Sequence, residues 1–352
     1  MNHLNDLTDL NKQHWENIVD LAIKICNNPS DYSHICDGKV LATLFYEPST
    51  RTQMSFQTAM LRLGGNIIGF DNPQNSSVSK GENLADTIRI ISGYADAIAI
   101  RHPIEGATLA AGQYTDSILI NAGDGGHFHP TQTLTDLVTI KKEIGHFDNL
   151  TVGLCGDLKN GRTVHSLINL LSRYDNIKFV LISTNELKLP DRFKHIIKSG
   201  TCSYIEVLSI EEAISDLDVL YMTRIQKERF ASEQLYNEQK NVYILDCAKL
   251  ENAKSTLKIL HPLPRVDEIA LEVDDDERAC YFKQAKYGVY ARMALIMNFM
   301  LQADKQFTTL NGAALDSYCS NPNCITNHEN YLKHSFLDVG GKLYCEYCDN
   351  PL

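Results

Sequence analysis

The chain has 352 residues, of which 43% are hydrophobic and 22% are charged, and its 44 acidic residues outnumber its 33 lysines and arginines. The net charge of -11, without a run of basic residues, argues against a nucleic-acid-binding protein, because phosphate backbones attract basic surfaces. The longest apolar stretches, such as Leu295 to Leu301, fall well below the ~20 residues that cross a bilayer, and no signal peptide is legible, so we expect a cytoplasmic protein.

Residues 1–148 alternate short β-type runs with helical periodicity, which is typical of an α/β domain with a parallel sheet. The predicted strands are Val40 to Phe45, Asn66 to Phe70, Ala97 to Arg101 and Ser117 to Asn121. Apolar residues at helical spacing predict a helix from Phe56 to Leu63, and a helix from Thr131 to Ile144 joins this domain to the next.

Residues 149–302 repeat the same alternation and predict a second α/β domain. Its predicted strands are Thr151 to Leu154, Phe179 to Ile182, Val219 to Thr223 and Val242 to Leu245. A helix is expected from Val164 to Leu171, and the apolar helix from Gly288 to Gln302 is expected to return to the first domain. The predicted fold class is therefore α/β, with two doubly wound parallel sheets, followed by a linker over residues 303–315.

Hydroxyl residues and an arginine follow the first predicted strand, where a helix begins. After the turn Glu47-Pro48 they are Ser49, Thr50, Arg51 and Thr52. Free backbone N–H groups and the positive end of the helix dipole favour an anion there, and the hydroxyls add donors. Helix capping is the simpler alternative, but a cap needs one hydroxyl and no arginine. The segment therefore predicts a phosphate site.

Four of the ten cysteines crowd into the C-terminal segment, at Cys319, Cys324, Cys345 and Cys348. Two thiolate pairs on two short turns have the spacing of a tetrahedral zinc site without an open coordination position. A redox role for Cys345 and Cys348 is the alternative, but such a motif usually opens a helix of a thioredoxin-like unit, which is not indicated here. We predict a small domain over residues 316–352 with one structural zinc ion, for which His328 and His334 are unnecessary ligands.

The run Phe45 to Thr52, with Ser55-Phe56 behind it, resembles the carbamoyl phosphate signature of the aspartate and ornithine carbamoyltransferases. Further family motifs follow in order: Ser79 to Glu82, Arg101 to Pro103, His129 to Gln132, Gly161 to Ser166, Thr223 to Gln226 and His261 to Arg265. One short match arises easily by chance, whereas the whole series in family order does not. The sequences Thr-Arg-Ile-Gln and His-Pro-Leu-Pro in the last two motifs favour the aspartate enzymes over the ornithine enzymes.

The resemblance implies a site for carbamoyl phosphate that needs no cofactor for catalysis. The implied phosphate ligands are Ser49, Thr50, Arg51, Thr52 and Arg101. Arg101, His129 and the Thr52 hydroxyl would donate hydrogen bonds to the carbamoyl oxygen, where negative charge builds during the reaction. With Arg51, these residues form the implied catalytic set.

Two acceptors for the carbamoyl nitrogen are also implied. They are Gln132 and the carbonyl of Leu263, which a cis bond before Pro264 would turn inward. Glu47 is expected to orient arginines such as Arg162 and Arg229.

The implied aspartate-binding residues are Lys80, Arg162, Arg224 and Gln226. Three cations suit a dicarboxylate substrate and would repel a cationic one such as ornithine. Lys80 lies in a predicted mobile loop, Asn72 to Gly81, which in the family reaches into the active site of the adjacent subunit. The resemblance therefore implies a homotrimer with shared active sites.

Residues Cys319 to Cys348 are similar to the zinc domain of the separate regulatory chain of the aspartate enzymes, whose nucleotide-binding half is missing here. We expect this domain to dock on a neighbouring catalytic subunit, and it could join two trimers. The implied activity transfers the carbamoyl group from carbamoyl phosphate to L-aspartate, a step of pyrimidine biosynthesis. Two alternatives remain: a carbamoyltransferase for another amino acid such as ornithine, and a catalytically silent, zinc-bearing interaction protein.

Overall fold

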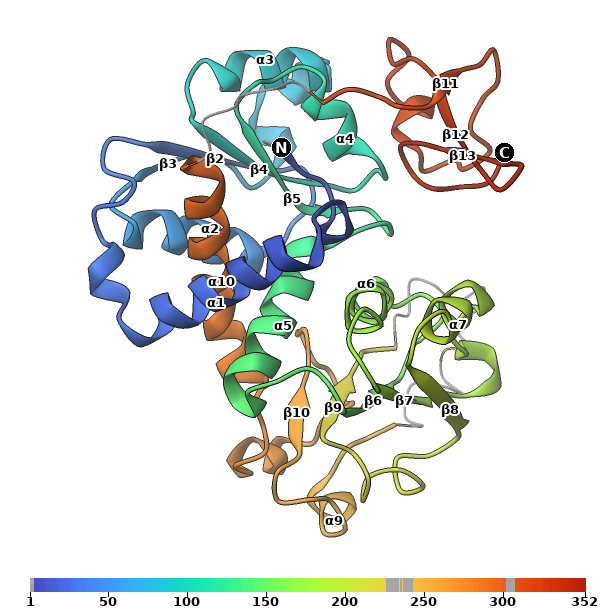
Figure 1. Ribbon diagram of the computed structural model, residues 1–352. Helices are drawn as coiled ribbons and strands as arrows, with labels where there is room; N and C mark the ends of the chain where they lie inside the picture. Colours follow the sequence, from blue (N-terminus) through green and yellow to red (C-terminus); the bar gives the residue numbers. More distant parts are fainter. Residues whose placement is uncertain (1–2, 226–233, 235, 237–242, 302–307) are drawn as a thin grey trace. The chain divides into compact units, whose positions relative to one another are not determined.

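The computed structural model describes residues 3–225, 234, 236, 243–301 and 308–352, and Figure 1 labels its helices and strands. The chain divides into two compact units, one of Met1–Thr131 with Val289–Leu352 and one of Gln132–Gly288. Among the described residues, every helix is too short or too polar to span a membrane.

The first unit contains a five-stranded parallel sheet in the order β1-β5-β4-β2-β3. Its strands are β1 (His3–Leu4), β2 (Val40–Phe45), β3 (Asn66–Phe70), β4 (Ala97–His102) and β5 (Ile118–Asp124). Its helices are α1 (Lys12–Asn27), α2 (Thr50–Arg62), α3 (Leu84–Ser92) and α4 (Ala107–Gly112). The four predicted strands are confirmed, and the structure adds β1, which is too short to leave a periodic signal.

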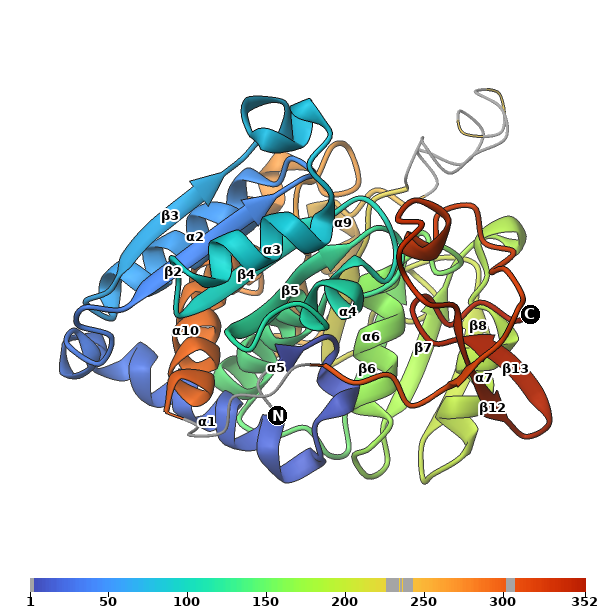
Figure 2. The ribbon, with the colours of Figure 1, turned by 90° about the horizontal axis from the view of Figure 1, so that it is seen from above.

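Helices cover both faces of this sheet, so its central strands read as continuous apolar runs rather than as alternating ones. Every residue of β4 from Ala97 to Arg101 is buried. Figure 2 shows α3 and α4 over β4 and β5, and α1 and α2 lie on the opposite face. In α2, Phe56, Ala59 and Met60 form the buried stripe that the sequence predicted.

The second unit contains another five-stranded parallel sheet, in the order β10-β9-β6-β7-β8. Its strands are β6 (Thr151–Cys155), β7 (Lys178–Ile182), β8 (Ser203–Val207), β9 (Val219–Met222) and β10 (Lys258–Leu260). The remaining helices in the described part of the chain are α5 (Pro130–Ile144), α6 (Arg162–Leu171), α7 (Asp191–Lys198), α9 (Cys247–Leu250) and α10 (Tyr281–Met300). The predicted α/β fold class with two parallel sheets is confirmed.

Two expectations for the second unit need correction. The predicted strand from Val242 to Leu245 is wrong in its described part, because Leu245 makes only an isolated bridge with Ile269 and β10 takes the sheet edge beside β9. Val242 itself lies outside the described residues. Helix α10 begins at Tyr281 rather than at Gly288. The sequence pattern missed its first turns because they bury only Tyr281, Gln284 and Tyr287 between exposed residues, which leaves no continuous apolar run.

The C-terminal part of α10 belongs to the first unit. There the Arg292 guanidinium donates to the Ser55 hydroxyl over 3.2 Å, and the Asn298 amide is 3.0 Å from the His14 ring. The last long helix is thus fastened to α2 and α1.

A small antiparallel sheet of β11 (Ala313–Ala314), β12 (Ser335–Val339) and β13 (Lys342–Cys345) forms the C-terminal domain. This domain packs on its own chain, beside α4 in Figure 1. Ile325, Phe336 and Tyr347 share one hydrophobic core with Ala107 and Ala110 of α4. The contact is close because a Cβ on Gly106 would lie only 2.6 Å from that of Tyr347.

Candidate active site and metal centre

The predicted phosphate residues lie together where β2 ends and α2 begins. Ser49 precedes the first turn of α2, and its side chain makes no capping hydrogen bond. Its hydroxyl instead donates to the Thr52 hydroxyl over 3.1 Å, and Thr52 is buried while Thr50 and Arg51 are exposed. The simple capping interpretation therefore does not describe Ser49, and the positive end of α2 keeps its anion-binding character.

Arg101 lies beside this segment, because β2 and β4 are neighbouring strands and Phe45 is in register with Arg101. Arg101 is 7% exposed. Its Nη2 is 2.7 Å from a carboxylate oxygen of Glu47, and its Nη1 is 3.4 Å from Nε2 of His129. Burial lowers the pKa of Arg101, and the charge and hydrogen bond of Glu47 oppose that shift. Two predicted donors to the carbamoyl oxygen thus meet at one point.

The carboxylate of Glu47 pairs with an arginine of its own unit. Glu47 lies two residues after the end of β2, and its carboxylate pairs with Arg101 at the end of the adjacent strand β4. Arg162 belongs to the other unit, and Arg229 lies outside the described residues.

His129 ends the loop between β5 and α5, and this loop is held by the fully buried carboxylate of Asp124. Asp124 accepts hydrogen bonds from the backbone N–H of Phe128 at 2.9 Å and from that of Gly106 at 3.0 Å. Gly123 has φ 127°, and a Cβ there would lie 2.7 Å from Nη1 of Arg101. Our sequence interpretation missed Asp124 and Gly123, although the Gly-Asp-Gly run before His129 is a turn signal.

In the second unit, Gln132 is oriented by a buried carboxylate one helical turn away. Its Nε2 donates to Asp136 Oδ1 over 2.8 Å, so its amide oxygen points elsewhere and can accept a hydrogen bond. Asp136 is fully buried and also accepts from the Tyr221 hydroxyl at 2.8 Å and from Gln284 at 2.7 Å. Burial raises the pKa of Tyr221 well above its ordinary value. Asp136, which the sequence interpretation missed, is the centre of this network.

The same network extends to the second predicted acceptor of the carbamoyl nitrogen. Gln284 accepts a hydrogen bond from the backbone N–H of His261 over 2.9 Å, and Nδ1 of His261 accepts from the N–H of Leu263 over 2.8 Å. Nε2 of His261 is 2.8 Å from a carboxylate oxygen of Glu268. Burial raises the pKa of Glu268, but hydrogen bonds, including the one with His261, outweigh that effect and lower it. The bond between Leu263 and Pro264 is cis, as the sequence predicted.

The predicted aspartate-binding cations lie at strand ends and in a loop. Arg162 is the first residue of α6, after β6, and Arg224 follows β9, the neighbour of β6 in a parallel sheet. Both therefore belong to the carboxyl edge of the second sheet, where ligands of α/β folds bind. Lys80 is exposed at the end of a 3-10 turn, Ser77–Lys80, which forms part of the predicted loop. Gln226 lies outside the described residues.

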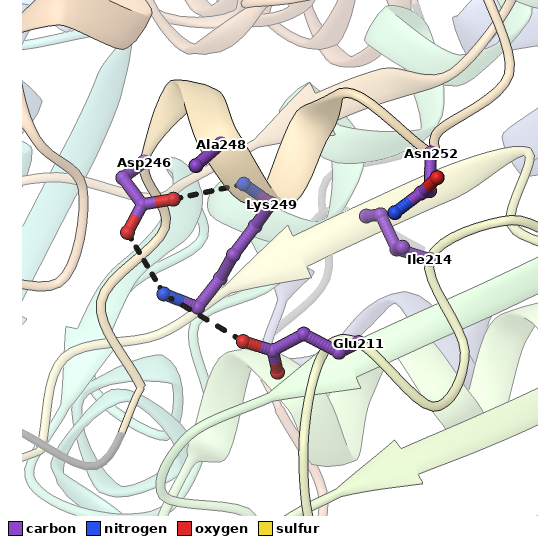
Figure 3. A pocket seen from close by; sticks show the side chains of 6 residues that line it. All are labelled: Glu211, Ile214, Asp246, Ala248, Lys249 and Asn252. Atoms are coloured by element: carbon purple, nitrogen blue, oxygen red, sulfur yellow. Dashed lines mark hydrogen bonds and ion pairs between the residues drawn. The ribbon is translucent and has the colours of Figure 1, made fainter.

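A pocket of about 270 Å³ lies elsewhere in the second unit, beside α9 (Figure 3). Its lining residues are Glu211, Ile214, Asp246, Ala248, Lys249 and Asn252. The Lys249 ammonium is already 2.9 Å from Asp246 and 3.8 Å from Glu211. None of the predicted site residues lines this pocket.

The four C-terminal cysteines form a candidate metal centre. Their sulfur atoms all lie within 4.8 Å of one another, and all four residues are buried. Cys319 and Cys348 are 3.5 Å apart, and Cys324 and Cys345 are 3.6 Å apart. These separations are close to the edge of about 3.8 Å that a tetrahedron of Zn–S bonds of 2.3 Å requires. Hydrogen bonds from Cys345 and Cys348 lower the pKa of the Cys324 thiol.

Family profiles match almost the whole chain. The carbamoyl-P binding domain of aspartate/ornithine carbamoyltransferase matches residues 2–142, and the Asp/Orn binding domain matches residues 148–299. The metal binding domain of the aspartate carbamoyltransferase regulatory chain matches residues 317–352.

Individual relatives agree with these matches. The aspartate carbamoyltransferase catalytic subunit of Clostridium perfringens is 57% identical over 302 residues, which cover 86% of this chain and 98% of the relative. That of Clostridium novyi is 57% identical over 294 residues, covering 84% of this chain and 96% of the relative.

Solved structures resemble the described fold. The catalytic subunit of M. jannaschii aspartate transcarbamoylase has a TM-score of 0.80 and 47% identity, covering 85% of this chain and 98% of that one. Aspartate transcarbamoylase from Trypanosoma cruzi in complex with carbamoyl phosphate and aspartate has a TM-score of 0.79 and 36% identity, covering 84% of this chain and 96% of that one.

Proposed function

Because this chain belongs to the aspartate/ornithine carbamoyltransferase family, as an aspartate carbamoyltransferase catalytic chain with a fused regulatory-type metal-binding domain, we propose a residue-level mechanism for carbamoyl transfer to L-aspartate. The products are N-carbamoyl-L-aspartate and phosphate, in pyrimidine biosynthesis. The observation that carries the mechanism is the meeting of Arg101 and His129 beside the first turn of α2.

The phosphate group binds at the start of α2. Ser49, Thr50 and Thr52 supply hydroxyl donors, and Arg51 and Arg101 supply charge. The backbone N–H groups of the first turn and the helix dipole add to the attraction. Support comes from the Ser49 side chain, which is not used as a helix cap.

The carbamoyl oxygen is held by Arg101, His129 and the Thr52 hydroxyl. When the aspartate amine attacks the carbamoyl carbon, an electron pair moves onto this oxygen, and the three donors stabilise the negative charge of the tetrahedral intermediate. The intermediate then collapses, the bond to the phosphate oxygen breaks, and the departing phosphate accepts the proton of the amine. No covalent enzyme intermediate and no cofactor are needed.

The carbamoyl nitrogen donates to the Gln132 side-chain oxygen and to the Leu263 carbonyl. Both acceptors are attached to the hydrogen-bond network of Asp136 within one unit. Asp136 is therefore a positioning residue that acts through Gln132 and through Gln284.

We expect Asp136→Asn to lower kcat about tenfold, because an amide group replaces an acceptor that faces three donors and leaves one of them unsatisfied. The matched control is Glu143→Gln, since Glu143 also lies on α5 and accepts from a tyrosine of α10, Tyr287. Steady-state kinetics and thermal melting of both variants check the prediction. Equal kcat values for the two variants would contradict it.

L-Aspartate is bound by Lys80, Arg162, Arg224 and Gln226, whose cations pair with its two carboxylates. Assays of carbamoyl phosphate with aspartate and with ornithine test this assignment. We expect turnover of aspartate only, and turnover of ornithine in its place would reject the assignment.

The catalytic unit is a homotrimer in which Lys80 completes the site of the adjacent subunit. Support comes from the exposed position of Lys80 at the end of its 3-10 turn.

We expect Lys80→Ala and Arg51→Ala to be nearly inactive separately and to regain activity when their subunits are mixed. In a mixed trimer, an intact Lys80 from one subunit can meet an intact Arg51 from its neighbour, so recovery of activity would show that the active site is shared between subunits. Each variant dissociated and reassembled alone serves as the control, and no recovery in the mixture would contradict the shared site.

Zinc is the proposed ion of the C-terminal domain, held by Cys319, Cys324, Cys345 and Cys348. Four thiolates leave no open coordination position, so the ion is structural. All ten cysteines are free thiols, which supports a cytosolic location, where thiols are kept reduced.

A further inference from the structure

The metal-binding domain contacts the loop that carries His129, and the contact is an ion pair through His127. Nε2 of His127 is 3.0 Å from a carboxylate oxygen of Asp349, and Nδ1 is 3.4 Å from a carboxylate oxygen of Asp124. The ring also lies against that of Phe128 at a tilt of 38°, with the ring centres 3.6 Å apart. His127 thus bridges the C-terminal domain and the carboxylate that organises the loop.

We propose that Asp349 and His127 position the loop before α5, so that the folded metal-binding domain supports catalysis in its own chain. The inference rests on the proposed function, because it needs His129 and Arg101 to act on the carbamoyl oxygen. The family motifs assign no role to either Asp349 or His127.

The loop end of this contact is rigidly connected to the site. The backbone N–H of His127 donates to the Asp124 carbonyl over 3.0 Å, and the N–H of Asp124 donates to the Phe128 carbonyl over 3.2 Å. Asp124 side-chain oxygens hold Phe128 and Asn121 as well, and Asn121 accepts from the N–H of Gly123 at 2.7 Å. A shift of His127 therefore moves the segment whose two ends, Gly123 and His129, lie beside the Arg101 guanidinium.

The other end of the contact depends on the metal centre. Asp349 follows Cys348, adopts a left-handed conformation with φ 57°, and donates its N–H to the Cys345 carbonyl over 2.9 Å. Its direction is therefore set by the turn that presents two of the four thiolates. Loss of that turn removes the carboxylate from His127.

Charge strengthens the contact. Burial of the imidazole opposes protonation, but the two flanking carboxylates outweigh it and raise the pKa of His127 to about 10. The ring is a cation at neutral pH, with both nitrogens donating, which gives it two directional bonds at once.

The test is Asp349→Gly, because glycine adopts the left-handed conformation without strain while the carboxylate disappears. The matched control is Tyr331→Phe, which removes a different contact of the same domain, the 3.0 Å hydrogen bond from the Ala85 N–H on α3. We expect Asp349→Gly to lower kcat about tenfold with the KM for carbamoyl phosphate changed less than about twofold, since the α2 site is untouched. Tyr331→Phe keeps kcat, and both variants keep one zinc per chain.

A double-mutant cycle with His127→Ala completes the experiment. If the two residues act as a unit, the double variant has the same kcat as His127→Ala alone. Additive losses, or equal kcat for Asp349→Gly and Tyr331→Phe, would overturn the inference. The variant His129→Ala distinguishes failure of the proposed function from failure of this inference. Full activity of His129→Ala rejects the proposed function. An inactive His129→Ala together with a fully active Asp349→Gly rejects only the role of Asp349.

Discussion

Replacing Arg101 with alanine lowers kcat by about 10²- to 10³-fold, the usual effect of removing one strong donor to a developing oxyanion. The guanidinium is expected to contact both the departing phosphate and the carbamoyl oxygen, so binding of carbamoyl phosphate weakens as well. The effect is large because Arg101 is buried, where a fixed charge acts through a low dielectric. Steady-state kinetics at saturating aspartate measure both changes.

The control for this prediction is Arg62→Ala. Arg62 also belongs to the first unit, where it lies over the Tyr290 ring and donates to its hydroxyl over 3.4 Å. We expect kcat of this variant to stay within about twofold of the parent, as for most surface substitutions. Added guanidinium ion should partly restore Arg101→Ala and leave Arg62→Ala unchanged. A kcat for Arg101→Ala near that of the parent would remove the central donor from the mechanism.

Replacing Cys324 with serine unfolds the C-terminal domain. A structural zinc site contributes about 10–16 kcal/mol of binding free energy in small zinc-dependent folds, and a segment this short has little other core. We expect loss of bound zinc and rapid proteolysis within residues 316–352, while the two α/β units stay resistant. Zinc analysis and limited proteolysis with mass spectrometry check this result.

The unfolded domain also uncovers the apolar surface of α3 and α4 that Ile325, Phe336 and Tyr347 normally cover. We therefore expect binding of a hydrophobic dye and a fall in kcat similar to that of Asp349→Gly, without complete loss of activity. Cys26→Ser is the control, because Cys26 lies on α1, away from the metal centre. Retention of zinc and of a protease-resistant C-terminus by Cys324→Ser would contradict the four-thiolate site.

Much of the fold was legible in the sequence because its elements leave strong local signals. Val40 to Phe45 and Asn66 to Phe70 are observed as strands at the predicted bounds. Val40 to Phe45 reads as a continuous apolar run because this strand is buried inside the parallel sheet. Strands β8 and β10 were missed. β8 lies at a sheet edge with exposed residues such as Ser203 and Ile205, and β10 has only three residues, so neither shows a clear period.

The sequence by itself determined the family, the parallel α/β class, the hydroxyl and arginine cluster at α2 and the four-cysteine set, because each of these is a contiguous motif or a fixed spacing. Only the tertiary structure decided which residues support them. Glu47 pairs with Arg101, Asp136 joins Gln132 to the turn before Leu263, and Asp349 reaches His127 across the chain. Such contacts join residues far apart in sequence, and their partners follow from strand order and domain packing rather than from any local pattern.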